Sequence, residues 1–134
     1  MVDPRDGAVL LLEKNGTTCG VYRAAWPGNG AEAVLERVAV FRIPLDLSFL
    51  RLVTAADLHP DGRRVLVRTY TTLFEYETAA GNPLPAVFDS SAARTLPTPG
   101  LAQTEAACYT RDGRDIVTTT EGLNPPLLIL RRKY

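Results

Sequence analysis

The sequence predicts an all-β protein built from about three hairpin-based repeats. Ten Gly and ten Pro among 134 residues favour a chain with many turns over a helical bundle. Asp-Gly pairs recur at positions 6–7, 61–62 and 112–113, each followed by a run of β-branched or aliphatic residues. Asp-Gly between two apolar runs indicates a β-hairpin, because Gly adopts a positive φ without a Cβ clash and Asp hydrogen-bonds to its own backbone.

The strands of each repeat follow in a fixed order. The Asp-Gly pairs are 55 and 51 residues apart, and the strands after them cover residues 9–12, 65–67 and 116–120. A third strand is expected at residues 19–23, 73–76 and 127–130. A fourth, outer strand is expected at residues 36–41 and, from a weaker pattern, at residues 86–88. Four strands in a repeat of about 40–50 residues are typical of a β-propeller blade.

The chain is therefore interpreted as a single partial β-propeller of about three four-stranded blades over residues 1–134. Blade 1 is expected at about residues 1–43, blade 2 at about 50–96 and blade 3 at about 102–134. The first repeat lacks an inner strand and the third has no clear outer strand. Three blades do not close a ring, so they leave strand edges and an apolar flank exposed. Either the chain is a piece of a longer gene product, or it is a half-propeller that closes as a six-bladed homodimer or with a complementary propeller chain.

Residues 31–40 also fit a helix. They are good helix formers, and Leu35, Val38 and Ala39 would share one helical face. We favour a strand for the second half of this segment, because residues 38–43 are rich in strand-forming types and end at Pro44.

Composition excludes several classes of function. Fifteen basic residues balance fifteen acidic ones, so nothing suggests nucleic acid or a membrane surface as a partner. The longest apolar run, residues 8–12, is far shorter than a membrane span, and the N-terminus does not resemble a signal peptide. A cytoplasmic location is expected, or a periplasmic or secreted one if the chain belongs to a longer exported protein. Cys19 and Cys108 each lie in an apolar stretch and are expected to be reduced core thiols, with a disulfide as the alternative.

Two carboxylates are the strongest functional candidates. Glu105 lies eight residues before Gly113, at the start of an inner strand, where a propeller lines its channel; Thr54 holds the same position in the second repeat. Glu121 ends the second strand of its repeat and aligns with Tyr70. A channel carboxylate could bind calcium or act as an acid or base. The alternative is a carboxylate that pairs with Arg68 or caps a turn.

Other candidates follow from the same alignment. Asp57 could be a third oxygen ligand, or its side chain could bond to the backbone of the following turn. Arg68, in the polar run Arg68-Thr69-Tyr70, could hold a carboxylate or phosphate, or form a salt bridge between blades. Lys14 aligns near Thr69 and has the same two interpretations.

The remaining polar residues are interpreted as structural and not as functional. Asp6, Asp61 and Asp112 recur with the repeat and are expected to shape turns. His59, the single histidine, is expected on a surface turn, a poor place for a buried Ser-His-Asp triad. Neither a zinc-ligand spacing nor a glycine-rich phosphate loop is present.

Residues 53–70, with the run Asp57-Leu58-His59-Pro60-Asp61-Gly62, resemble a signature of bacterial propellers of the SMP-30/phytase-like esterase-domain type. Residues 103–113 and 119–122 resemble the same family, and residues 3–7 fit a preceding blade. The resemblance implies a β-propeller, often secreted, in a group where some relatives bind a divalent metal in the channel. It places Glu105 and Glu121 within family motifs. Family members are longer and carry an acidic Trp-Glu-Asp-type motif that this sequence lacks.

These observations lead us to expect a propeller module of unassigned activity, with a binding or structural role, that needs a second copy or chain to close. The alternative is a metal-dependent hydrolase of esterase, lactonase or phosphatase type. Its channel would hold calcium on Glu105 and Glu121, and Asp57, Arg68 and Tyr70 would contact the ligand.

Overall fold

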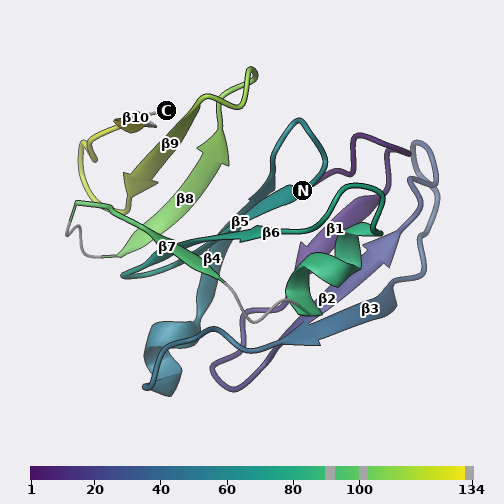
Figure 1. Cartoon of the computed structure of the whole chain (residues 1–134), viewed down its shortest axis with the longest axis horizontal. Helices are drawn as coiled ribbons and strands as arrows, with labels where there is room; N and C mark the ends of the chain where they lie inside the picture. Colours follow the sequence, from purple (N-terminus) through teal and green to yellow (C-terminus); the bar gives the residue numbers. More distant parts are fainter. Residues whose placement is uncertain (90–92, 100–102, 132–134) are drawn as a thin grey trace.

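Three small antiparallel sheets follow one another along the chain, and none of them is closed (Figure 1). The structure, a computed structural model, describes residues 1–89, 93–99 and 103–131. The first sheet contains β1 (Val9–Leu12), β2 (Cys19–Ala24) and β3 (Glu36–Phe41). The second contains β4 (Val53–Leu58), β5 (Arg64–Thr69), β6 (Leu73–Glu77) and β7 (Arg94–Leu96). The third contains β8 (Thr104–Tyr109), β9 (Asp115–Thr120) and β10 (Leu128–Arg131).

Within each sheet every strand pairs with its neighbours in sequence, the up-and-down order of a propeller blade. The predicted all-β class is confirmed, and the three sheets are consistent with a propeller fragment; we call them blades 1, 2 and 3. Blade 2 alone shows four strands among the described residues. In blade 1 the inner strand is reduced to a bridge between Val2 and Val9. No helix in the described part of the chain is long and apolar enough to cross a membrane.

The outer segments differ in part from the prediction. Residues 36–41 form a strand, so the helical alternative for residues 31–40 is wrong. Residues 86–88 were expected as a strand but belong to η2 (Leu84–Asp89), a 3₁₀ helix, and the outer strand of blade 2 is β7. Pro83 and Pro85 explain the difference, because proline fixes φ and cannot donate to a strand ladder. A second 3₁₀ helix, η1 (Ser48–Arg51), joins blades 1 and 2.

The three Asp-Gly turns behave as predicted. Oδ1 of each aspartate accepts the N–H two residues further on, at 3.0 Å for Asp6, 2.9 Å for Asp61 and 3.1 Å for Asp112. The glycines that follow adopt a φ of 75°, 71° and 70°. These aspartates therefore shape the hairpins.

The first turn contains one more residue before its Asp-Gly pair than the other two. Each turn is closed by a backbone hydrogen bond, in which the N–H of the residue before the turn donates to the carbonyl of the residue after it. The closing pairs are Asp3–Ala8, His59–Arg64 and Thr110–Asp115. Counted from these pairs, Leu10 occupies the position of Leu66, although the Asp-Gly alignment pairs Leu66 with Leu11. This one-residue shift decides which side chains of β1 face blade 2, because strand side chains alternate.

Blades 1 and 2 share the larger apolar core. Leu10 and Val21 of blade 1 pack with Val65 and Val67 of blade 2. An aromatic group lies beside them: the ring centroids of Phe41 and Phe88 are 4.6 Å apart, those of Phe41 and Tyr76 5.5 Å, and those of Tyr76 and Phe88 5.9 Å. η2 thus covers this core from the side of β3.

Blades 2 and 3 share a smaller core with more polar contacts. Its buried apolar residues are Leu66, Leu73, Leu96, Ala107, Tyr109 and Ile116. The Tyr109 hydroxyl donates to Glu75 Oε1 at 2.9 Å, and Thr54 Oγ1 donates to the carbonyl of Thr104 at 2.9 Å. This interface therefore depends on directional hydrogen bonds as well as on apolar burial.

The two cysteines are both free. Cys19 is buried, and burial raises the pKa of its thiol to about 12. Cys108 is exposed, so the expectation of a core thiol is wrong for this residue. Its neighbours Ala107 and Tyr109 take the buried face of β8, and alternation turns Cys108 to the other face.

Candidate functional site

Residues that end the second strand of successive blades lie together with Glu105. Each lies six positions beyond the residue that closes the turn of its blade: Lys14, Tyr70 and Glu121. The alignment of Glu121 with Tyr70 agrees with the sequence analysis. Lys14, which the Asp-Gly alignment places near Thr69, also holds the position of Tyr70, because the Asp-Gly pair lies one residue later within the first turn. We call Lys14, Tyr70, Glu105 and Glu121 the Glu–Lys–Tyr cluster.

A β-bulge presents Glu105 to this cluster. The register of β8 against β9 shifts between Thr104 and Ala106, so Glu105 is the extra residue. β4 has the same irregularity between Val53 and Ala55, with Thr54 as the extra residue. Bulges re-aim side chains and are frequent beside functional sites. The predicted equivalence of Glu105 and Thr54 thus has a structural cause.

Lys14 connects blade 1 to the carboxylates of blade 3. Its Nζ donates to the Tyr70 hydroxyl at 2.7 Å and lies 3.6 Å from Glu105 Oε1. The same Nζ lies 4.7 Å from the centroid of the Tyr70 ring, a cation–π contact. The Tyr70 carbonyl accepts the N–H of Thr104 at 3.4 Å, which holds the end of β5 beside the start of β8. All three blades thus contribute to one polar group.

The two glutamates titrate as a pair. A hydrogen bond between their carboxyl groups shifts the two pKa values in opposite directions. This bond, together with hydrogen bonds from Tyr70 and the nearby Lys14, holds the pKa of Glu105 below its usual value. The same bond, with repulsion from the Glu105 charge, raises the pKa of Glu121. The hydrogen bond to Tyr70 and the charge of Glu105 raise the pKa of Lys14.

This arrangement suits proton exchange better than calcium binding. Two neighbouring carboxyl groups whose pKa values are shifted apart are the pattern of an acid–base pair. Calcium takes six to eight oxygen ligands, whereas the ammonium of Lys14 already lies against Glu105. No group of three or more His, Cys, Asp or Glu within residues 1–89, 93–99 and 103–131 is arranged to hold a metal ion.

Asp57 lies outside the cluster, at the interface of blades 2 and 3. Its Oδ2 accepts the backbone N–H of Tyr109 at 2.8 Å. A bond from Asp57 to the following turn was predicted as the alternative to ligand binding, but the Asp57 carboxylate bonds to the next blade instead. Asp57 thus links β4 to β8.

Arg68 also lies outside the cluster. Its side chain is on the face of β5 that carries Leu66, and the residue is 1 % exposed. Burial lowers the pKa of its guanidinium, and Nε and Nη1 find no hydrogen-bond partner among the described residues. The alternative of a salt bridge between blades is not observed in that part of the chain.

His59 is buried, which the sequence did not indicate. Its Nε2 lies 3.1 Å from the carbonyl oxygen of Gly113, and its ring meets that of Tyr109 edge-on at 4.7 Å. The expected surface turn is covered because the turn of blade 3 packs against it. No local signal could have shown this, since the contact joins residues 54 positions apart.

No protein-family model matches the chain, and no curated protein matches it.

Proposed function

We propose that this chain is a propeller binding module that becomes complete when two copies form a six-bladed ring. The observation that carries the proposal is the exposure of two sheet faces whose equivalents are buried inside the chain. The likeness of residues 53–70, 103–113 and 119–122 to SMP-30/phytase-like propellers remains a prediction beside it.

The outer face of blade 1 is the first exposed face. In blade 2 the equivalent face of β5 carries Val65 and Val67, both 0 % exposed because blade 1 covers them. On β1 the same positions are held by Val9 and Leu11, and Leu11 is 46 % exposed. An apolar groove of about 420 Å³ crosses this flank, and Leu11, Trp26 and Leu35 are among its lining residues.

The outer face of blade 3 is the second exposed face. In blade 2 the equivalent face carries Leu66, which is 0 % exposed beneath blade 3. In blade 3 the position of Leu66 is held by Val117, which pairs with Ile129 on β10, and Ile129 is 56 % exposed. Burying such apolar faces stabilises a complex by roughly 25 cal/mol per Å² of apolar surface.

A second copy fits both faces. Inside the chain, the face of each blade that points towards the next blade (its forward face) packs on the opposite face (the backward face) of that next blade. The forward face of blade 3 can therefore pack on the backward face of blade 1 of another copy. A two-fold axis makes this contact twice, so all six blades gain neighbours.

Light scattering after size exclusion tests this proposal on the full chain. We expect a dimer at micromolar concentrations, and monomers for Leu11→Glu and for Ile129→Glu. Leu47→Glu is the matched control: Leu47 is 53 % exposed but lies between β3 and η1, away from both flanks. A monodisperse monomer across the accessible concentration range would contradict the proposal, and so would monomers of the Leu47 variant.

A second candidate function, hydrolysis, is favoured by the neighbouring carboxyl groups of Glu105 and Glu121, whose pKa values are shifted in opposite directions. The protonated Glu121 would donate to a leaving group while ionised Glu105 activates water. We expect Glu105→Gln to abolish hydrolysis of a p-nitrophenyl ester, with Glu36→Gln, at an exposed glutamate of β3, as the control. If the hydrolase instead uses calcium held by Glu105, we expect added calcium chloride to raise the melting temperature, and Glu105→Gln to abolish that rise. Equal turnover by both variants, or no turnover by the unmodified chain, would exclude this candidate.

A further inference from the structure

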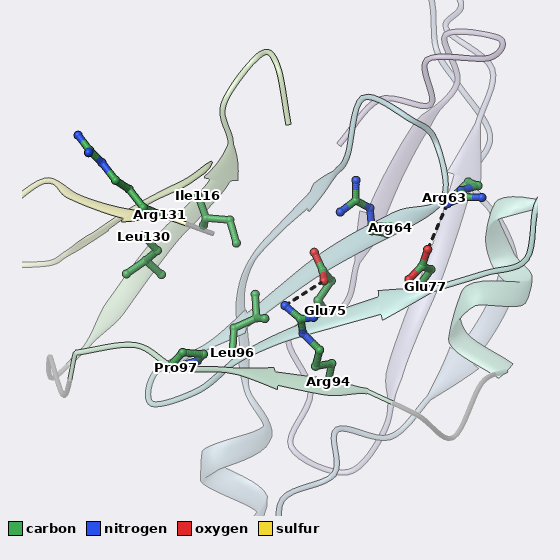
Figure 2. A pocket seen from close by; sticks show the side chains of 10 residues that line it. All are labelled: Arg63, Arg64, Glu75, Glu77, Arg94, Leu96, Pro97, Ile116, Leu130 and Arg131. Carbon is green, nitrogen blue, oxygen red and sulfur yellow. Dashed lines mark hydrogen bonds and ion pairs between the residues drawn. The ribbon is translucent and has the colours of Figure 1, made fainter. Parts of the chain in front are cut away.

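A cavity of about 680 Å³ lies between blades 2 and 3, at the outer part of the sheets (Figure 2). None of its lining residues belongs to the Glu–Lys–Tyr cluster or to the exposed faces of blades 1 and 3. Its volume falls within the range of small-molecule sites in proteins, about 300–1,000 Å³. Because both walls come from one chain, the cavity does not depend on the proposed dimer.

One part of the cavity wall is apolar. Leu96 and Pro97 line it from blade 2, and Ile116 and Leu130 line it from blade 3. Leu96 and Ile116 also belong to the buried core between these blades, and Leu130 packs against that core. The apolar wall is therefore rigidly supported and continues the hydrophobic core to the surface.

The other part is charged, with an excess of cations. Four arginines and two glutamates line the cavity, so the formal charge of the lining is +2. Both carboxylates already have partners. Glu77 pairs with Arg63 at 3.2 Å, and the buried Glu75 accepts the Tyr109 hydroxyl at 2.9 Å and lies 3.9 Å from Arg94.

Two guanidinium groups remain directed at the cavity. Figure 2 shows Glu75 between Arg64 and Arg94, whereas Arg131 extends away from the other lining side chains. The side chain of Arg94 is 66 % exposed, and its contact with Glu75 is too long for a hydrogen bond. Arg64 is anchored from behind by Asp61 at 2.9 Å and by the His59 ring. Arg94 thus offers free donors beside an arginine of fixed position.

We propose that this cavity binds a small amphipathic carboxylate. The carboxylate would accept hydrogen bonds from Arg94 and Arg64, because guanidinium groups match the geometry of carboxylates. The apolar body would lie on Leu96, Ile116 and Leu130. A cation is disfavoured by Arg64 and Arg94 beside the cavity, and a purely apolar ligand would leave the guanidinium of Arg94 with only its long contact to Glu75.

Hexanoate is the probe, and the two halves of the proposed ligand are its controls. Acetate carries the carboxylate without the apolar body, and hexan-1-ol carries the body without the charge. We would titrate each into the ¹⁵N-labelled full chain and follow the amide resonances. We expect hexanoate to shift the amides of Leu96, Ile116 and Leu130 in a saturable manner. Hexan-1-ol should bind at least about tenfold more weakly, since a hydrogen bond to a charged group contributes about that much. Acetate should also bind at least about tenfold more weakly, because it lacks the apolar chain that the cavity would bury.

Arg94→Gln tests the charged contact without endangering the fold, because Arg94 is exposed. We expect about tenfold weaker binding of hexanoate and unchanged binding of hexan-1-ol. Arg114→Gln is the matched control, an exposed arginine that pairs with Asp112 outside the cavity, and it should bind hexanoate normally. Equal affinity for hexanoate and hexan-1-ol, an unaffected Arg94 variant, or shifts confined to the exposed faces of blades 1 and 3 would each overturn the proposal.

Discussion

The two interfaces between blades hold the molecule together in different ways. Between blades 1 and 2, aliphatic and aromatic side chains form a continuous buried core with three ring contacts. Between blades 2 and 3, six buried apolar residues are supplemented by hydrogen bonds from Asp57, Tyr109 and Thr54. Arg68 and Glu75 are buried there, and Glu75 also lines the cavity.

This difference separates stability from recognition. A dry apolar interface stabilises the fold and offers little chemistry, because apolar burial is non-directional. An interface with buried polar groups has donors and acceptors at fixed positions, which a ligand can use. We therefore expect blades 1 and 2 to form the stable body of the chain and blade 3 to carry most of the recognition.

The largest effect is expected in the first interface. Phe74→Ala removes a ring that is 1 % exposed in the core between blades 1 and 2. We expect a loss of about 3–5 kcal/mol in the free energy of unfolding, measured in urea. Phe49→Ala, at an exposed phenylalanine in η1, is the control and should change this value by about 0.5 kcal/mol or less. Equal losses in both variants would contradict the assigned core.

A pair of glycine substitutions compares the turns at the two interfaces. Gly62 and Gly113 share a positive φ, so alanine should cost about 1–2 kcal/mol at either position. A Cβ on Gly113 would lie 2.2 Å from His59 Nε2, whereas one on Gly62 would meet nothing closer than 3.7 Å. We expect Gly113→Ala to lose about 1–3 kcal/mol more than Gly62→Ala in the same unfolding assay. Equal losses would show that His59 does not pack on the third turn.

Asp57 tests the polar link in the second interface. Asp57→Ala leaves the Tyr109 N–H without its acceptor, and we expect a loss of about 1–3 kcal/mol. Asp57→Asn keeps an acceptor oxygen at this position and should recover most of the loss. Hydrogen exchange at the Tyr109 amide reports the bond directly and should accelerate in the alanine variant alone. Acceleration in both variants would argue for a role of the charge itself.

The smallest effect concerns the Glu–Lys–Tyr cluster, which spans both interfaces. Because the pKa of Glu105 is lowered, its contribution to stability is present above its unfolded pKa and lost as the pH falls through the folded one. The raised pKa of Glu121 acts in the opposite direction, with its contribution lost as the pH rises through the folded pKa. We expect carboxyl ¹³C titrations to show Glu121 ionising above Glu105, and Glu105→Gln to bring Glu121 towards its usual range. Identical titration of the two groups would contradict the opposite shifts of their pKa values.

Much of the fold could be predicted from the sequence, because turn chemistry and strand patterns are local. Asp61 and Gly62 identify a hairpin by themselves, and β5 and β6 follow from the apolar runs beside it. It was harder to predict that a 3₁₀ helix, η2, takes the place of the strand expected at residues 86–88. Val87 and Phe88 fit a strand by composition, and they are held in η2 by packing against Phe41, a residue of another blade.

The candidate site was predicted in part for the same reason. Glu105, Glu121 and Tyr70 occupy repeat positions that alignment within the chain can find. The role of Lys14 depends on the one-residue offset of the Asp-Gly pair within the first turn, which alignment on the Asp-Gly pairs conceals. The burial of Arg68 and His59 depends on the neighbouring blade, so a single repeat carries no sign of it.

The offset of the Asp-Gly pair within the first turn has a consequence for building larger assemblies from this chain. A designer who duplicates a blade and joins the copies at the Asp-Gly pairs would place β1 one residue out of phase. Leu11 would then point where Leu10 belongs, and the new blade would present its wrong face to its neighbour. Junctions cut at the closing pairs Asp3–Ala8, His59–Arg64 and Thr110–Asp115 preserve the phase in every blade. Blades should therefore be exchanged at these hydrogen-bonded pairs and not at the Asp-Gly motif.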